Sequence, residues 1–337
     1  MDRRDPDPRD PTAEGITAAD LPLPPRLGEP PPLFARLDLP DGGWIRHARW
    51  PAPDACRGTV VLLHGRSEFL EKYDGVARAW RERGFQAIGM DWRGQGRSSR
   101  LLSEDPPLRQ RGHVCDYGLW LDDLARFLEA VAVPEAGRPL VACAHSQGAH
   151  LLLRHLARSP RGFDAVVLSA PMTDIYTQPG WVPRPVARAL ARAGVRLGLG
   201  ARYLPGQGDY DPARHSFAAN PVTSDPASWA VHHQWFRHDP ALVVGGVTHG
   251  WLDATYRSLA ELARPEAAVG VETPMLALVP GCDVVVPPDS QRAACARYRH
   301  CRVHVLADAM HEVLMERAEI RAAAWAEVDR FLADALE

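Results

Sequence analysis

A serine stands between small residues where an apolar run ends, in VACAHSQGAH at residues 141–150. The apolar run is typical of a buried strand, and Leu152 and Leu156 after it have the spacing of a helix face. A serine hydroxyl is a weak nucleophile at neutral pH, so it needs an adjacent base and an acid that orients the base. We therefore expect Ser146 to be a nucleophile whose partners come from elsewhere in the chain.

The elements that must position Ser146 alternate between apolar strands and helical stretches. Continuous apolar runs predict strands covered on both faces. Strands and helices in turn predict βαβ units, hence an α/β fold with a mostly parallel central sheet and helices on both faces. The expected strands lie in 33–50 (a pair around a turn), 58–65, 85–92, 139–146, 163–171, 273–281 and 301–306, and the expected helices near 70–83, 116–132, 147–158, 289–298 and 313–335.

The alternation stops between residues 171 and 255, where proline and glycine are frequent. A structureless loop of that length is improbable inside a compact domain, so we predict a mainly helical lid (cap) insertion at 171–255. The core then comprises 33–170 and 256–337, and the proline-rich residues 1–32 form a flexible arm. The insertion contains four tryptophans, which suit either a lipid-facing surface or a core of its own: Trp181, Trp229, Trp235 and Trp251.

The residues around the serine, 144–148 (AHSQG), resemble the nucleophile elbow of the α/β-hydrolase fold, with alanine in place of the usual first glycine. That motif places the serine on a sharp turn from strand to helix, which requires small neighbours. Four further stretches resemble the monoglyceride lipase and lysophospholipase group of serine hydrolases: HGRSEFLEKY, DWRGQGRSSR, GGVTHGWL and MHEVLMER. The resemblance covers the chain from about residue 33 to its end.

The resemblance implies the chain order serine, acid, histidine. Asp283 and His311 each lie just past a late apolar strand, where that fold has its acid and its base. Asp308 is a rival acid, but it lies on the same loop as the histidine. His145 is a rival base, but neighbouring residues on a strand point to opposite faces. We expect Ser146, Asp283 and His311 to be the catalytic residues.

The resemblance also implies an oxyanion hole, in which N–H groups stabilise the negative charge of a tetrahedral intermediate. One donor is expected to be the backbone N–H of Gln147, directly after the nucleophile. The other is expected to be the backbone N–H of Arg66, in the loop after the 58–65 strand. The side chain of Arg66 is in addition a candidate to face an anionic headgroup.

These residues predict a serine hydrolase that cleaves carboxylic esters through an acyl-enzyme. The resemblance implies a small-molecule acyl ester or lipid substrate with one fatty acyl chain, such as a monoacylglycerol or a lysophospholipid. An aminopeptidase or amidase of the same fold is an alternative, because the three catalytic residues do not distinguish the bond that is cleaved. A non-catalytic α/β-hydrolase-like binding protein is a further alternative, although such proteins usually lack one of the three.

The composition argues against several other classes. The formal net charge is −3 and the arginines are scattered, so no nucleic-acid partner is expected. The six cysteines lack metal-finger spacing, and HExxH is absent, so no metal or cofactor is expected. A secretory signal and a run of ~18 apolar residues are also missing. We expect a cytoplasmic protein and leave open peripheral contact with the inner face of the membrane, as well as the oligomeric state.

Overall fold

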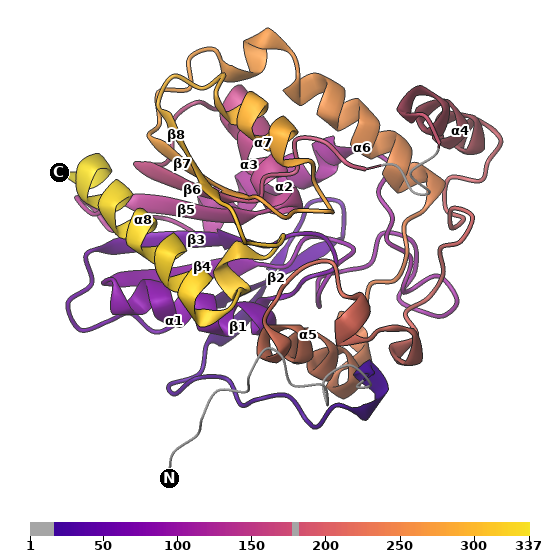
Figure 1. Ribbon diagram of the computed structural model, residues 1–337, viewed down its shortest axis with the longest axis horizontal. Helices are drawn as coiled ribbons and strands as arrows, with labels where there is room; N and C mark the ends of the chain where they lie inside the picture. The colour runs from indigo at the N-terminus through magenta and orange to yellow at the C-terminus, as the bar shows by residue number, and fades with distance from the viewer. Residues whose placement is uncertain (1–16, 177–181) are drawn as a thin grey trace.

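An eight-stranded sheet forms the centre of the computed structural model, which describes residues 17–176 and 182–337 (Figure 1). The spatial order is β1-β2-β4-β3-β5-β6-β7-β8; β2 pairs antiparallel with both β1 and β4, and all the other neighbouring strands pair parallel. The predicted mostly parallel sheet is confirmed. The strands are β1 (Leu33–Asp38), β2 (Trp44–Arg49), β3 (Gly58–Leu63), β4 (Phe85–Met90), β5 (Leu140–His145), β6 (Ala165–Ser169), β7 (Met275–Pro280) and β8 (Cys301–Leu306).

Helices cover both faces of the sheet (Figure 1). Val60 and Leu62 of β3 pack with α1 and α8, whereas Val61 and Leu63 pack with α2 and α3 on the opposite face. A strand buried on both faces alternates in this way, which explains its uninterrupted apolar sequence. The helices of the two outer layers are α1 (Asp74–Glu82), α2 (Tyr117–Ala130), α3 (Gln147–Arg158), α7 (Pro288–Cys295) and α8 (Ala318–Leu336).

The last helix begins later than the sequence predicted. Residues Val313–Met315 form a short 3-10 turn, and α8 starts only at Ala318. The carboxylate of Glu316 accounts for the break, because it accepts hydrogen bonds from the backbone N–H groups of Met310 (2.7 Å) and Ser224 (3.0 Å). These bonds hold the loop before α8 out of a helical path.

Between β6 and β7 the described residues, 170–176 and 182–274, form three helices, α4 (Arg184–Arg196), α5 (Pro226–His238) and α6 (His249–Leu262), joined by loops and 3-10 turns. Trp251, Ala254 and Leu262 of α6 belong to the same apolar core as α2 and α3. The expected boundary at residue 255 therefore falls inside a helix of the core layer. The division into core and lid stays a prediction, and Trp181 lies outside the described residues.

The described part of the predicted N-terminal arm packs beside α5 (Figure 1). Ala18 and Leu21 are buried against Trp229, and the N–H of Ala18 donates to the carbonyl oxygen of His215 (2.8 Å). Residues 1–16 lie outside the described residues. Trp229 and Trp251 are both buried, so these two tryptophans form core and not lipid-facing surface.

Candidate active site

Ser146 occupies the turn between β5 and α3. Its φ of 50° and ψ of −115° lie where residues other than glycine are rarely found. The turn is held on both sides, because the N–H of Ser146 donates to the carbonyl of Ser169 (3.0 Å) and its carbonyl accepts from the N–H of His150 (3.0 Å). A Cβ on Gly148 would lie 2.4 Å from the carbonyl oxygen of Leu63. Only glycine therefore lets α3 approach β3 this closely.

The three side chains that the sequence predicted to act together lie in one chain of hydrogen bonds. His311 Nε2 is 2.9 Å from Ser146 Oγ, and His311 Nδ1 is 2.8 Å from Asp283 Oδ2. All three residues are buried. The rival acid, Asp308, is exposed, and the partner of Nδ1 is Asp283. The residues are brought together from the ends of β5, β7 and β8.

Four hydrogen bonds hold the carboxylate of Asp283. Oδ1 accepts from the backbone N–H groups of Val285 (2.8 Å) and Val286 (2.9 Å), and Oδ2 accepts from Gln291 Nε2 (2.9 Å) as well as from His311. Burial alone would raise the pKa of Asp283, but the contact with His311 and the backbone donors outweigh it and lower the pKa. An ionised Asp283 favours a proton on Nδ1 of His311 and leaves Nε2 as the acceptor.

His145, the rival base, packs against His311 and bonds elsewhere. The centroids of the two rings are 4.8 Å apart, and His145 Nδ1 lies 3.2 Å from the carbonyl oxygen of Ser169. Burial lowers the pKa of His145 to about 4, so its ring is neutral near pH 7. The nitrogen in hydrogen-bond contact with Ser146 Oγ belongs to His311.

The two backbone groups expected to form the oxyanion hole lie close to the serine. Gln147 is the first residue of α3, so its N–H has no partner within the helix. Arg66 follows Gly65, where a Cβ would lie only 3.2 Å from Ser146 Cβ. Both N–H groups are without a protein acceptor in the described part of the chain, and their role in an oxyanion hole stays a prediction.

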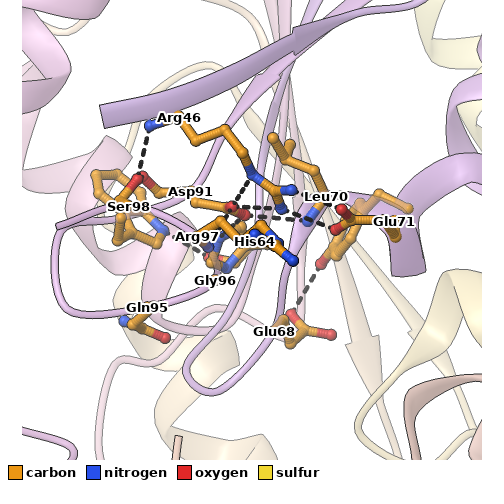
Figure 2. A network of polar contacts seen from close by, with 12 residues as sticks. Arg46, His64, Glu68, Leu70, Glu71, Asp91, Gln95, Gly96, Arg97 and Ser98 are labelled. Carbon is orange, nitrogen blue, oxygen red and sulfur yellow. Dashed lines mark hydrogen bonds and ion pairs between the residues drawn. The ribbon is translucent and has the colours of Figure 1, made fainter. Parts of the chain in front are cut away.

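Asp91 fixes the loop that follows β3 (Figure 2). Its carboxylate is fully buried and accepts hydrogen bonds from the N–H groups of Leu70 (3.0 Å) and Arg97 (2.9 Å) and from the guanidinium of Arg46 (2.7 Å). His64 Nε2 lies 3.4 Å away. Burial alone would raise the pKa of Asp91, but the charge of Arg46 outweighs it and lowers the pKa. One carboxylate therefore joins β2 to the loops after β3 and β4.

Gln95 completes the support of this loop. Its Oε1 accepts the N–H of Ser67 (2.6 Å), a residue with a φ of 62°. A Cβ on Gly96 would lie 2.2 Å from Cγ of Asp91, so only glycine fits at this position beside the carboxylate. In the sequence this stretch shows only a resemblance to the family, whereas the positioning roles of Asp91 and Gln95 emerge from the structure.

A second buried cluster joins the β3 loop to the histidine loop. Lys72 Nζ donates to Glu68 Oε1 (2.7 Å) and to Glu312, the residue after His311. The other oxygen of Glu68 accepts the N–H of Gly65 (2.6 Å). The lysine and both glutamates are buried. The cluster therefore fixes the distance between the loop that carries Arg66 and the loop that carries the base.

The charges of this cluster depend on one another. Burial alone would lower the pKa of Lys72, but the two carboxylates raise it. Burial would likewise raise the pKa of Glu68, but Lys72 and His145 lower it. For Glu312 burial prevails over Lys72, and its pKa is raised. Removal of the ammonium would leave two carboxylates in the interior without a cation between them, which is strongly unfavourable.

A cavity of about 380 Å³ opens at Ser146 and His311. Part of its wall is apolar and includes Val222, Trp229 and Val285. A second cavity, of about 580 Å³, adjoins it, and the residues common to both walls are Arg66, Ser67, Arg214, His215, His232 and His233. Within the described part of the chain, no cluster of three or more His, Cys, Asp or Glu side chains is arranged to hold a metal ion.

The fold and the placement of the serine define an α/β hydrolase. A monoglyceride lipase of Saccharomyces cerevisiae, solved as a soluble variant with a substrate analogue, superposes with a TM-score of 0.73 at 17% identity, over 93% of this chain and 99% of that one. The family model described as serine aminopeptidase, S33, matches residues 54–318, and the chain belongs to this family.

Two relatives are similar over most of the chain. Lysophospholipase L2 of Escherichia coli (strain K12) is 31% identical over 83% of this chain and 81% of its own length. Probable lysophospholipase L2 of Haemophilus influenzae is 27% identical over 85% of this chain and 87% of its own length. The resemblance to the monoglyceride lipase and lysophospholipase group is confirmed.

Lys72→Met is expected to lower the free energy of unfolding by about 3–5 kcal/mol, because two buried carboxylates lose their shared cation. Urea unfolding followed by tryptophan fluorescence measures the change. Arg126→Met is the control, since its ion pair with Glu129 (3.7 Å) is exposed and should contribute little. A loss for Lys72→Met no larger than that for the control would contradict the role given to the cluster.

Proposed function

We propose that the protein hydrolyses carboxylic esters of lipids with one acyl chain, through an acyl-enzyme on Ser146. The observation that carries the proposal is the chain of hydrogen bonds from Ser146 through His311 to Asp283, at the wall of a partly apolar cavity. The likeness to proteins named lysophospholipase L2 supports the substrate class. In this proposal Asp283 orients the base and does not itself take up the proton.

The reaction has two halves. His311 Nε2 takes the proton of Ser146 as Oγ bonds to the acyl carbon, and the N–H groups of Arg66 and Gln147 donate to the oxyanion. The intermediate collapses when the bond to the alcohol oxygen breaks, and the alcohol leaves with the proton held by His311. Water then attacks the acyl-enzyme by the same route, releasing the fatty acid and restoring the serine.

The charges at the cavity favour an ester over an aminopeptidase substrate, although the family model carries the aminopeptidase name. A free amino terminus is an ammonium group and needs a carboxylate beside the scissile bond. Among the described residues, the acidic side chains of the cavity wall are those of Glu68 and Glu312, and both are bonded to Lys72. Neither is free to bind a substrate ammonium.

A direct comparison of substrates tests the proposed function. We expect p-nitrophenyl acyl esters to be hydrolysed far faster than aminoacyl p-nitroanilides, and Ser146→Ala to lower ester turnover by about 10⁴-fold or more. Ser159→Ala, at the exposed far end of α3, is the control and should keep wild-type turnover. Faster cleavage of the anilides would favour the aminopeptidase instead, and full turnover by Ser146→Ala would exclude the acyl-enzyme on this serine.

We further propose that helix α4 brings the protein to the surface of an anionic membrane. The helix contains four arginines and no acidic residue. Val186, Leu190 and, just after the helix, Leu197 are 46%, 60% and 75% exposed. A helix that combines exposed apolar side chains with arginines can lie in the interface of an anionic bilayer. No helix of residues 17–176 and 182–337 has the length and apolar character to span a bilayer.

Leu190→Gln is expected to weaken binding to phosphatidylglycerol vesicles about 5-fold or more, because it removes an apolar side chain from the membrane contact. Co-sedimentation with vesicles measures the partition. Val133→Gln is a matched control, since Val133 is also 60% exposed but lies outside α4, in the loop after α2. Equal binding by wild type and Leu190→Gln, or equal binding to phosphatidylcholine and phosphatidylglycerol vesicles, would contradict this membrane contact.

A further inference from the structure

The guanidinium of Arg66 lies in the interior beside the second cavity. It donates to the carbonyl oxygen of Gly245, and its carbon lies 5.4 Å from the centre of the Trp251 ring. A Cβ on Gly112 would come within 2.7 Å of Nη2, so the space for this group depends on a glycine. The arginine side chain is therefore held in a fitted site and is not free in solvent.

The described residues give this guanidinium no counter-charge. Its Nε is buried and has no hydrogen-bond partner among them. Burial lowers the pKa of Arg66 to about 10, and the groups that oppose this are the hydroxyls of Tyr117 and Tyr203, not carboxylates. The group remains a cation near pH 7. A buried cation without a partner is unfavourable, and an anion bound beside it would relieve that cost.

The position of Arg66 links this cation to the reaction site. Arg66 lines both the cavity at Ser146 and the adjoining cavity of about 580 Å³. The carboxylates of Asp209 and Asp211 are exposed and line the second cavity as well. An anion at Arg66 and a cation nearer solvent would therefore both meet opposite charges.

We propose that the Arg66 guanidinium binds the phosphodiester of a lysophospholipid, whose headgroup fills the second cavity while its acyl ester lies at Ser146. This inference deepens the proposed function, on which its catalytic part rests. A zwitterionic headgroup would place its ammonium toward Asp209, because Asp211 is already paired with Arg214 (3.2 Å). A planar guanidinium suits a phosphate because it can donate two parallel hydrogen bonds.

The spacing within one residue fits this substrate. The backbone N–H of Arg66 is the proposed donor to the ester oxyanion, and its guanidinium is the proposed partner of the phosphate. The arginine side chain and the glycerol part of a lysophospholipid place about the same number of covalent bonds between those two ends. In this proposal one residue binds both the carbonyl oxygen and the phosphodiester of the same molecule.

Two substrates that share the acyl chain but differ in the headgroup distinguish the role of the Arg66 side chain from the role of its backbone N–H. A lysophosphatidylethanolamine and a monoacylglycerol with the same acyl chain are compared in the same mixed micelles. Arg66→Met keeps the backbone N–H and is expected to lower kcat/KM for the lysophospholipid at least 10-fold more than for the monoacylglycerol. Arg66→Lys keeps the charge but not the two parallel donors, so it should retain only part of the preference. The control is Arg158→Gln, because Arg158 is exposed, pairs with Asp122 (3.4 Å) and lines neither cavity, and it should shift the ratio less than 2-fold. Equal losses on both substrates, or no loss on either, would overturn the proposal.

A binding measurement tests the anion site without turnover. Ser146→Ala protein is titrated calorimetrically with glycerophosphoethanolamine, which carries the headgroup but no acyl chain. We expect Ser146→Ala protein to bind this compound, and the double variant Ser146→Ala/Arg66→Met to bind it at least 10-fold more weakly. No binding by Ser146→Ala protein would overturn the proposal. If wild type cleaves neither ester but Ser146→Ala protein binds the headgroup in an Arg66-dependent way, the proposed function fails and the anion site stands.

Discussion

The imidazole of His311 is hydrogen-bonded at both ring nitrogens, on one side to Ser146 and on the other to Asp283. These bonds join the ends of three parallel strands, since the serine follows β5, the aspartate β7 and the histidine β8. In open parallel sheets the carboxyl ends of the strands lie along one edge, where residues distant in sequence meet. The contacts around the site hold the imidazole ring of His311 between Ser146 and Asp283.

Buried charges provide much of that support. Asp91 holds the loop after β3 through Arg46 and two backbone N–H groups, and Lys72 joins the same loop to the residue after His311. Buried ion pairs contribute little net stability compared with apolar packing, but removal of one partner is costly. Their value here is positional, because each cluster fixes the distance between loops on different strands. Arg66 lies on one of these loops but differs from these charged groups, because no carboxylate among the described residues raises the pKa of its guanidinium.

The sequence predicted the parts of the site that have a local signature. The Ser146 turn could be recognised because an apolar strand precedes it and a helix follows, and Asp283 and His311 could be placed because each follows a strand. The bond of Gln291 to Asp283 and the pairing of Lys72 with Glu312 could not be predicted, because such contacts arise only in the folded chain and leave no period in the sequence. The predicted start of α8 at residue 313 was wrong by five residues, since the helix begins at Ala318. The carboxylate of Glu316 accepts hydrogen bonds from the backbone N–H groups of Met310 and Ser224, and these bonds hold the residues before Ala318 out of the helix.

A kinetic cycle on the two residues behind the nucleophile tests most directly whether the imidazole and its carboxylate act as one unit. His311→Ala, Asp283→Ala and the double variant are compared by kcat on one p-nitrophenyl ester, with folding checked by circular dichroism. If Asp283 acts only through His311, the double variant will be no slower than His311→Ala alone. A double variant slower by the product of the two separate losses would show independent action and contradict the account.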